Sequence, residues 1–164
     1  MFVEAAALGP ILDVAGGDGR NSLYLAGQNL DVICCDLSKE QLDKARLQAE
    51  RMGLNIRVWP VDLEQPGVNP FPEDAYGGVM VFRYLHRPLI PCIRKALKKG
   101  GLLMYETFTV EQARFGKPSN PDFLLKPGEF ESWFADWEII HQFEGIVDNP
   151  ERAIARIVCR KPQS

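Results

Sequence analysis

The stretch that decides the fold reads ILDVAGGDGRN and occupies residues 11–21. Its first four residues are mostly apolar and predict a buried strand, which breaks into a glycine-rich turn. A helical pattern follows over residues 21–26. A strand, a tight glycine turn and a helix together form half of a nucleotide-binding βαβ unit, so the sequence predicts a nucleotide-type ligand at this turn.

Two acidic residues, Asp13 and Asp18, distinguish this turn from a dinucleotide-binding turn. A pyrophosphate is anionic and binds bare backbone N–H groups at a helix N-terminus, so two carboxylates would repel it. They suit a cationic ligand that carries an ammonium and a sulfonium group, and S-adenosylmethionine is such a ligand. A nicotinamide dehydrogenase is also disfavoured because Ser22 stands where the third fingerprint glycine would be.

The composition is typical of one soluble globular domain. The chain has 164 residues, of which 46% are hydrophobic and 25% charged, and this length suffices for a real core. We find neither a signal peptide nor a run of about 18 apolar residues, so we expect a cytoplasmic protein without membrane segments. Cys34 and Cys35 are adjacent and no CxxC pair occurs, so we expect reduced thiols, with no disulfide frame and no metal site.

Charge is distributed unevenly along the chain. Residues 1–82 hold 6 Lys and Arg against 12 Asp and Glu, and residues 118–164 hold 5 against 8. Residues 83–117 hold 8 Lys and Arg against 2 acids. The acidic first part suits a cationic cofactor, and the basic middle favours an anionic acceptor. For half of the middle segment the favoured interpretation is instead a solvated helix face with a cationic last turn, formed by Arg94, Lys95, Lys98 and Lys99.

Short apolar runs alternate with helical patterns, which predicts an α/β fold with a mostly parallel sheet. Strands are expected at residues 10–14, 31–35, 55–59, 78–82 and 102–107, with a final antiparallel pair at 138–143 and 153–159. One helix begins after a capping box of Ser38 and Gln41 and stops at Gly53. Further helices are expected from Leu89 to the glycine pair at 100–101, and at 129–134. Proline-rich loops are expected at 64–75 and 109–128, the second long enough to suggest a functional role.

Two further acids follow the ends of predicted strands. Asp36 lies 17 residues beyond Gly19 and is placed to accept both ribose hydroxyls of a nucleoside, although it also suits the start of the helix after Ser38. Asp62 can accept a hydrogen bond from an adenine amino group while Leu63 packs on the ring. Taken alone, Asp62 is equally consistent with an ordinary loop acid, but ligands of open α/β sheets bind outside these strand ends.

As a set, these features resemble the class I S-adenosylmethionine-dependent methyltransferases. Residues 13–19 resemble that family's acidic-Gly-x-Gly-x-Gly motif, with Ala15 in place of the first glycine. The exchange is mild if residue 15 has a negative φ. Asp36, Asp62 and the GGLL stretch at 100–103 fit the later motifs in order and spacing. Residues 17–26 and 126–130 resemble, more narrowly, the tellurite-resistance-type methyltransferases.

The resemblance implies one Rossmann-like domain over residues 1–164, with helices on both faces of a mostly parallel seven-stranded sheet. Its strand order would be 3-2-1-4-5-7-6, ending in an antiparallel hairpin. Family members usually carry N-terminal helices that cover the cofactor, whereas about nine residues precede the first strand here. Either residues 1–8 are the remnant of a longer N-terminus, or the cleft is unusually open. The implied cofactor is S-adenosyl-L-methionine, and the implied contacts are Asp13, Ala15, Gly16, Gly17, Gly19, Arg20, Asn21, Asp36, Leu37, Asp62, Leu63 and Phe82.

By the family's topology, the ends of the fourth and fifth strands face the methyl group, and the candidate catalytic residues there are Arg83, Tyr84, His86 and Arg87. His86 is the best candidate for a general base because an unperturbed histidine titrates near neutrality. A surface or capping histidine is an equal alternative. Arg83 and Arg87 can bind an oxyanion bidentately, or instead pair with Glu106 or another acid. Tyr84 can remove a proton or simply form the wall of the cleft.

The function expected from the sequence is methyl transfer to a small acceptor by in-line displacement, with an anionic acceptor favoured. The expected partners are a small-molecule acceptor, no nucleic acid and no membrane, and the sequence carries no indication of oligomeric state. A protein or nucleic-acid methyltransferase is a weaker alternative because the chain is acidic and residues 83–86 do not form an Asn/Asp-Pro-Pro-Tyr tetrad. A non-catalytic S-adenosylmethionine-binding or interaction protein is the third alternative, suggested by Ala15 and the short N-terminus.

Overall fold

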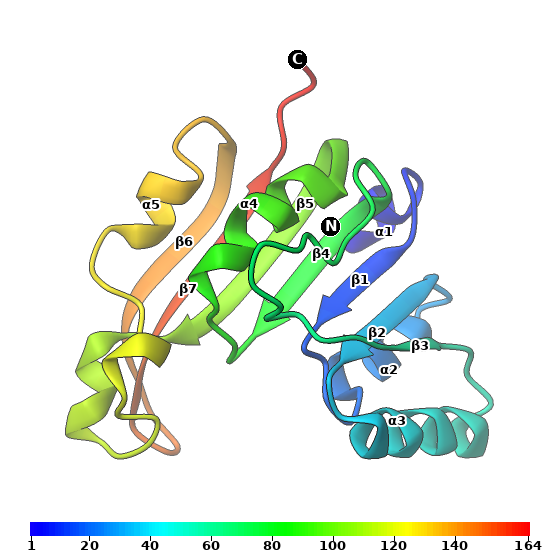
Figure 1. The fold of residues 1–164 in the computed structure, drawn as a ribbon, viewed down its shortest axis with the longest axis horizontal. Helices are drawn as coiled ribbons and strands as arrows, with labels where there is room; N and C mark the ends of the chain where they lie inside the picture. Colours follow the sequence, from blue (N-terminus) through cyan, green and yellow to red (C-terminus); the bar gives the residue numbers. More distant parts are fainter.

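The computed structural model describes all residues, 1–164, and the strand that opens the glycine-rich turn lies inside its sheet, paired on both sides. All four residues of this strand are buried, as expected where helices cover both faces of a parallel sheet. The seven strands are β1 (Ile11–Val14), β2 (Val32–Asp36), β3 (Arg57–Pro60), β4 (Tyr76–Phe82), β5 (Leu97–Phe108), β6 (Glu138–Val147) and β7 (Arg152–Arg160). They form one sheet in the order β3-β2-β1-β4-β5-β7-β6, which confirms the predicted topology (Figure 1).

The sheet has a parallel part and an antiparallel edge. The pairings β1–β2, β1–β4, β2–β3 and β4–β5 are parallel, whereas β7 pairs antiparallel with both β5 and β6. The carboxyl ends of β1 to β5 therefore meet at one edge of the sheet. In Figure 1 the arrowheads of β1, β4 and β5 point toward this lower edge. Ligands of such sheets bind outside this edge, so it is the place to look for a site.

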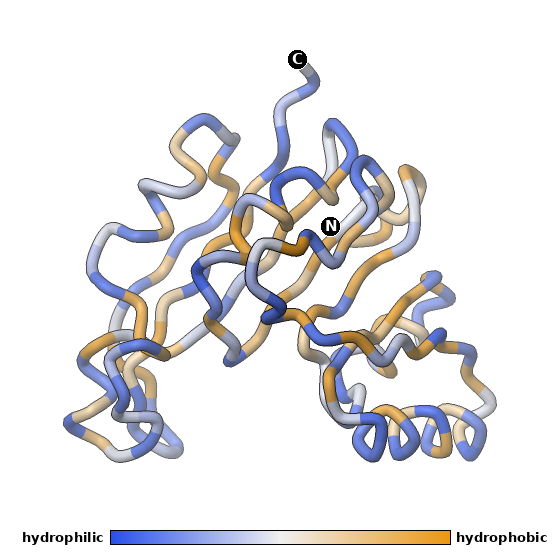
Figure 2. The backbone as a smooth tube through the Cα atoms, in the orientation of Figure 1, coloured by the Kyte–Doolittle hydropathy of each residue, from blue (hydrophilic) through white to orange (hydrophobic).

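Helices cover both faces, as predicted. They are α1 (Phe2–Ala6), α2 (Arg20–Ala26), α3 (Lys39–Met52), α4 (Ile90–Ala96) and α5 (Glu129–Trp133), with 3-10 turns η1 (Arg87–Leu89), η2 (Val110–Arg114) and η3 (Pro121–Phe123). A core cluster of 23 buried residues includes α4 and α5, and one of 8 includes α1 and α2 on the opposite face. Figure 2 shows hydrophobic residues concentrated on the central strands. None of the helices has the length and apolar character needed to span a membrane.

The caps of α3 follow the sequence signals. The Ser38 hydroxyl accepts a hydrogen bond from the Gln41 backbone N–H at 3.2 Å, which satisfies one of the free donors of the first turn. Gly53 adopts φ of 68° and ends the helix in the left-handed conformation that glycine tolerates best. The predicted start and stop of this helix are confirmed.

The end of α4 differs from the prediction. The helix stops at Ala96, and β5 begins at Leu97, so Lys98, Lys99 and the glycine pair lie in the strand and not in a cationic last turn. The backbone N–H of Ala75 bonds to the Ala96 carbonyl at 2.9 Å, and the Lys161 ammonium donates to the carbonyls of Arg94 and Leu97. These long-range bonds take up carbonyls that a longer helix would have used, and the strand starts there.

The N-terminal helix α1 lies away from the carboxyl edge. Phe2 and Ala5 are buried, and α1 packs on β1, β4 and β5. A Cβ on Gly77 would collide with the Ala5 carbonyl, and one on Gly78 would lie 2.8 Å from a ring carbon of Phe2. The residues before β1 thus cover the opposite end of β4 and leave the carboxyl edge of the sheet uncovered.

Candidate active site

The turn after β1 is held in an unusual backbone conformation. Ala15, Gly17 and Gly19 have φ values of 53°, 59° and 80°. The condition under which the exchange of glycine for Ala15 would be mild, a negative φ, is therefore not met: the alanine occupies the left-handed region, which is unfavourable by roughly 1–2 kcal/mol for a residue with a Cβ. The N–H of Gly16 bonds to the Cys35 carbonyl at 3.0 Å and ties the turn to the end of β2. Strain of this kind is commonly stored at ligand sites.

The three glycines of the turn are required for different reasons. A Cβ on Gly16 would lie 2.5 Å from the Cys34 sulfur and 2.7 Å from a carboxylate oxygen of Asp13. A Cβ on Gly19 would lie 2.8 Å from that of Ala45 in α3. Nothing lies within 4 Å of the Cβ position of Gly17, so that residue faces open space. Gly16 and Gly19 permit packing, whereas Gly17 leaves room beside the turn for a ligand.

The two acids of the turn lie in different surroundings. Asp13 is buried, and its Oδ2 accepts a hydrogen bond from the Ser22 hydroxyl at 2.7 Å. Burial raises the pKa of Asp13 to about 7, so its carboxylate is only partly ionised at neutral pH. Asp18 is exposed and lines an open groove between α2 and α3. Asp13 thus connects the turn to the first residues of α2 through Ser22. Neither Asp13 nor Asp18 lines the two cavities described below.

Asp36 connects the glycine turn to the start of α3. Its Oδ2 accepts the N–H of Gly17 at 2.9 Å, and its Oδ1 accepts the N–H of Ser38 at 2.8 Å. Both interpretations of Asp36 are therefore compatible, because each carboxylate oxygen keeps a lone pair for a further donor. Asp62 similarly accepts the Glu64 N–H at 2.9 Å and keeps its other oxygen free of protein partners.

These acids line a cavity of about 490 Å³ at the carboxyl edge of the sheet. Its apolar surface includes Leu37, whose exposed fraction of 71% is high for a leucine. The cavity is lined by Ala15, Asp36, Leu37, Asp62, Leu63, Glu64, Arg83 and Tyr84. The structure thus brings together seven residues predicted as site residues from four separate parts of the chain.

A second cavity, of about 260 Å³, shares Glu64, Arg83 and Tyr84 with the first. Its other lining residues are Leu85, Thr107, Phe108, Pro118 and Phe123. Residues 109–128, which we call the lid segment, supply Pro118 and Phe123. Arg83 is exposed, has a φ of 56°, and lies with its guanidinium 5.7 Å from the ring centre of Phe108. No carboxylate pairs with it, so Arg83 is available to an anion.

The polar group at the junction of the two cavities is centred on Glu64. The Tyr84 hydroxyl donates to Glu64 Oε2 at 2.9 Å, and His86 Nδ1 lies 3.5 Å from Oε1. Burial and the Glu64 carboxylate raise the pKa of Tyr84 far above its usual value, so this phenol is a neutral donor and not a base. Sequence reasoning missed Glu64, although its place two residues after Asp62 was a usable signal.

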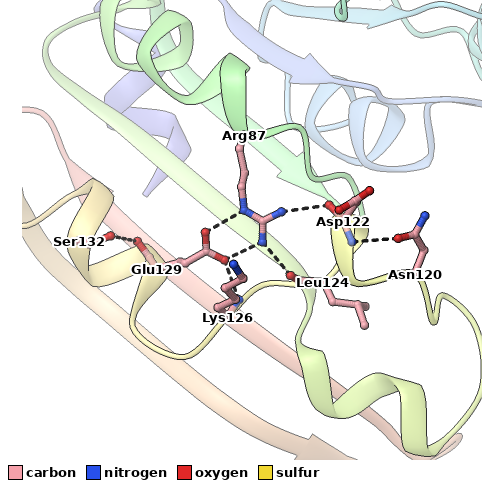
Figure 3. Close-up of polar contacts among 7 residues, drawn as sticks. All are labelled: Arg87, Asn120, Asp122, Leu124, Lys126, Glu129 and Ser132. Carbon is pink, nitrogen blue, oxygen red and sulfur yellow. Dashed lines mark hydrogen bonds and ion pairs between the residues drawn. The ribbon is translucent and has the colours of Figure 1, made fainter.

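Arg87 is occupied by protein groups. Its Nε and Nη2 donate to the two carboxylate oxygens of Glu129, each at 2.8 Å, and its other bonds go to the carbonyls of Asp122 and Leu124 (Figure 3). The prediction that Arg87 binds an anionic acceptor is therefore corrected in favour of the alternative, pairing with an acid. That acid is Glu129, because Glu106 pairs with Arg156.

Besides Asp13 and the three glycines of the turn, three predicted cofactor contacts line neither cavity. Arg20 lines the open groove between α2 and α3, which measures about 580 Å³. Phe82 packs with the smaller core cluster, and Asn21 is half-buried in the first turn of α2. The groove is larger than either cavity, but Asp36, Asp62 and Arg83 do not line it. The two smaller cavities therefore form the candidate site.

Comparison with known proteins agrees with this geometry. Residues 11–101, more than half of the chain, match a family described as a methyltransferase domain. The chain belongs to this family. It is 26% identical over 141 residues to the probable S-adenosyl-L-methionine-dependent methyltransferase TehB of Haemophilus influenzae, covering 83% of this chain and 48% of that protein. It is 25% identical over 165 residues to the tRNA 5-carboxymethoxyuridine methyltransferase of Escherichia coli strain K12, covering 82% and 63%.

The crystal structure of TehB from Haemophilus influenzae has the same fold. It superposes with a TM-score of 0.77 at 21% identity, covering 98% of this chain and 60% of that one. The Rossmann-like fold and the resemblance to class I S-adenosylmethionine-dependent methyltransferases are thereby confirmed. This methyltransferase domain spans about half the length of the TehB protein that it matches, at 48%.

Proposed function

We propose that this domain transfers a methyl group from S-adenosylmethionine to a small anionic acceptor. The observation that carries the proposal is the pair of cavities at the carboxyl edge of the sheet, which share Glu64, Arg83 and Tyr84. The larger cavity has the acids and leucines that suit a nucleoside, and the smaller one has apolar walls beside the shared Arg83, a cation without a carboxylate partner. In-line methyl transfer needs two adjoining compartments of this kind because donor and acceptor must face each other.

The residues of the larger cavity fit the cofactor that the family implies. Asp36 retains lone pairs beside the open side of Gly17, where ribose hydroxyls would be accepted. The free oxygen of Asp62 suits the adenine amino group, and Leu37 and Leu63 offer apolar surface for the ring. When bound, S-adenosylmethionine supplies an electrophilic methyl group on a sulfonium. Binding of the cofactor would also remove the exposed Leu37 side chain from water, which favours the bound state.

The smaller cavity supports a small acceptor that carries negative charge. Arg83 is its one cation, and a guanidinium binds carboxylates and other oxyanions bidentately. Phe108 and Phe123 provide apolar walls that exclude water and thereby strengthen this attraction. A volume of about 260 Å³ limits the acceptor, or the part of it that enters, to a small group.

Proton transfer in this arrangement depends on the acceptor. An acceptor whose attacking atom already carries the negative charge needs no base, and Arg83 then orients it. A neutral acceptor would pass its proton to Glu64, whose carboxylate Tyr84 holds in place by donating a hydrogen bond. His86, beside the other carboxylate oxygen, would share that proton. Tyr84 positions Glu64 and does not itself take the proton.

A nucleic acid is the second candidate acceptor, because one relative is named as a tRNA methyltransferase. The observations on this chain favour the small acceptor. The formal net charge is −3, and the Asp and Glu residues outnumber Lys and Arg, which weakens attraction to a polyanion. The smaller cavity is also covered by the lid segment.

The experiment begins with calorimetric titration of the protein with S-adenosylmethionine and S-adenosylhomocysteine. Transfer of a labelled methyl group is then measured to mercaptoacetate, selenite and unmodified tRNA in parallel. Arg83→Ala should lower transfer to the small anions at least about 10-fold while cofactor affinity changes little. Arg51→Ala removes the same charge from the exposed last turn of α3, outside both cavities, and is the matched control. Absence of cofactor binding would overturn the proposal, and transfer to tRNA alone would establish the second candidate.

A further inference from the structure

The lid segment has a buried root and an exposed tip. At the root, the Leu125 N–H bonds to the Phe108 carbonyl at 2.9 Å, and Leu124 and Leu125 are buried. The tip carries Pro118 and Phe123, the two lid residues that line the smaller cavity. Phe123 is 54% exposed, so its own burial does little to hold it in place. The shape of the smaller cavity therefore depends on what fixes the chain around Phe123.

Arg87 donates hydrogen bonds to the backbone on both sides of Phe123. Its Nη1 donates to the Asp122 carbonyl at 3.1 Å, and its Nη2 donates to the Leu124 carbonyl at 2.9 Å. Figure 3 shows the guanidinium lying between these two carbonyls and the Glu129 carboxylate. These bonds join η1 to a segment 35 and 37 residues later in the chain. Arg87 thus connects η1, the turn that precedes α4, to the wall of the smaller cavity.

Glu129 holds the guanidinium in the orientation that these two hydrogen bonds require. Its two oxygens accept Nε and Nη2 of Arg87, and Oε1 also accepts the Lys126 N–H at 2.7 Å. Both side chains are largely buried, with exposed fractions of 30% for Arg87 and 18% for Glu129. A bidentate pair with limited exposure fixes geometry more firmly than an exposed ion pair does.

We propose that the Arg87–Glu129 pair is a latch that holds the lid segment over the acceptor cavity and so restricts the size of the acceptor. The inference rests on the proposed function, because it assigns the smaller cavity to the methyl acceptor. Arg87 is in this view a positioning residue: it acts through Phe123 and Pro118 and does not touch the reacting atoms. The planar fork of arginine is needed, since a lysine would satisfy only part of this set of acceptors.

A second arginine of the chain provides a matched control. Arg94 makes a bidentate pair with Asp136, at 3.0 and 2.7 Å, and donates to the Trp133 carbonyl at 2.7 Å. It therefore resembles Arg87 in its bonds and also has a side-chain exposure of 30%. Arg94 links α4 to the end of α5 and lines neither cavity. Comparison of the two variants separates an effect on the lid segment from a general effect of losing a buried guanidinium.

The first test is hydrogen exchange of the backbone amides, compared between wild type, Arg87→Ala, Glu129→Gln and Arg94→Ala. Arg87→Ala and Glu129→Gln should speed exchange at residues 122–126 by at least about 10-fold, and Arg94→Ala should not. Exchange at these residues in the double variant Arg87→Ala/Glu129→Gln should be little faster than in Arg87→Ala alone, because both changes remove the same ion pair. Wild-type exchange in Arg87→Ala would overturn the proposal, whereas failure of the wild type to bind S-adenosylhomocysteine would overturn the proposed function.

The second test separates positioning from stability by steady-state kinetics with mercaptoacetate and the bulkier 2-mercaptobenzoate. Arg87→Ala should raise the KM for mercaptoacetate about 10-fold, keep the KM for S-adenosylmethionine within about twofold, and narrow the preference for the smaller thiol. Arg87→Lys should recover part of the wild-type preference for mercaptoacetate over 2-mercaptobenzoate. An equal loss of affinity for cofactor and acceptor in Arg87→Ala would show a general structural role and overturn the latch. The exchange measurement decides the proposal even for a thiol that the wild type does not methylate.

Discussion

The cavity beside the glycine turn and the cavity beneath the lid segment share residues, but different contacts hold them in place. Around the first, backbone groups dominate: the N–H groups of Gly17, Ser38 and Glu64 bond to the carboxylates of Asp36 and Asp62. Around the second, side chains dominate, as in the pairs Tyr84–Glu64 and Arg87–Glu129. The first cavity therefore depends on backbone positions, and the shape of the second depends on single side chains that a substitution removes.

Two arginines of one segment show the same contrast. Arg83 and Arg87 both follow β4, and by type alone they are equivalent anion-binding residues. Arg83 lies over Phe108 without an acidic partner, whereas Arg87 is enclosed by Glu129 and two carbonyls. The difference arises from where α5 and the lid segment pack, and it separates a group that can meet the acceptor from one that shapes the cavity.

The largest effect is expected from Asp36→Ala, which changes the cavity beside the glycine turn. The change removes the acceptor of two backbone N–H groups and the partner proposed for the ribose, so S-adenosylhomocysteine affinity should fall at least about 100-fold. Calorimetric titration measures this loss. The control is Asp31→Ala, which removes an exposed partner of Arg57 just before β2. An affinity within about fivefold of wild type would contradict the role of Asp36.

The next effect concerns Asp13, which supports the same pocket from beneath. Its pKa of about 7 in the folded chain exceeds the 3.8 of an unperturbed aspartate, so between pH 4 and pH 7 the folded state binds the extra proton. Stability should therefore fall as pH rises through this window, by up to about 4 kcal/mol. Urea denaturation at several pH values should show this slope for wild type and a flatter one for Asp13→Asn. Equal slopes would place the proton elsewhere.

Tyr84→Phe tests the cavity beneath the lid segment, which is held mainly by contacts between side chains. It removes the donor that holds Glu64 and leaves the backbone contacts of Asp36 and Asp62 intact. Methyl transfer to the thiol of mercaptoacetate, which must lose its proton to Glu64, should drop about 10-fold while S-adenosylhomocysteine affinity changes less than about twofold. Steady-state kinetics combined with calorimetry provides both values. A parallel loss in the two measurements would show that Tyr84 acts mainly through cofactor binding and would remove the contrast between the two cavities.

The smallest effect is expected from Ala15→Gly. A glycine accepts the positive φ of this position without the steric conflict of a Cβ, which favours the folded state by about 1 kcal/mol, partly offset by the greater freedom of glycine in the unfolded chain. Thermal unfolding should show a small rise in Tm. A clear fall in Tm would mean that the alanine methyl makes packing contacts that outweigh the strain.

Local signals predicted the frame of the domain and the acids of its larger cavity. The strand segments, the caps of α3 and the positions of Asp36 and Asp62 were predictable because each depends on a few neighbouring residues. The strand order was predicted from the resemblance to the methyltransferase family, and the structure confirms it. In a parallel sheet the carboxyl ends of successive strands must meet at one edge, so residues that follow these strands come together without further information. The assignment to class I methyltransferases rested on this arrangement.

The tertiary structure alone decided the φ of Ala15, the burial of Asp13, the part played by Glu64, the partner of Arg87 and the end of α4. Each depends on groups distant in sequence: Cys35 for the turn, Tyr84 for Glu64, Glu129 for Arg87, and Ala75 and Lys161 for the helix end. Residue type states what a side chain is able to bind. Which of the available partners it meets is settled only when the elements pack, because the free energy of burial and the neighbouring charges then select one partner among several.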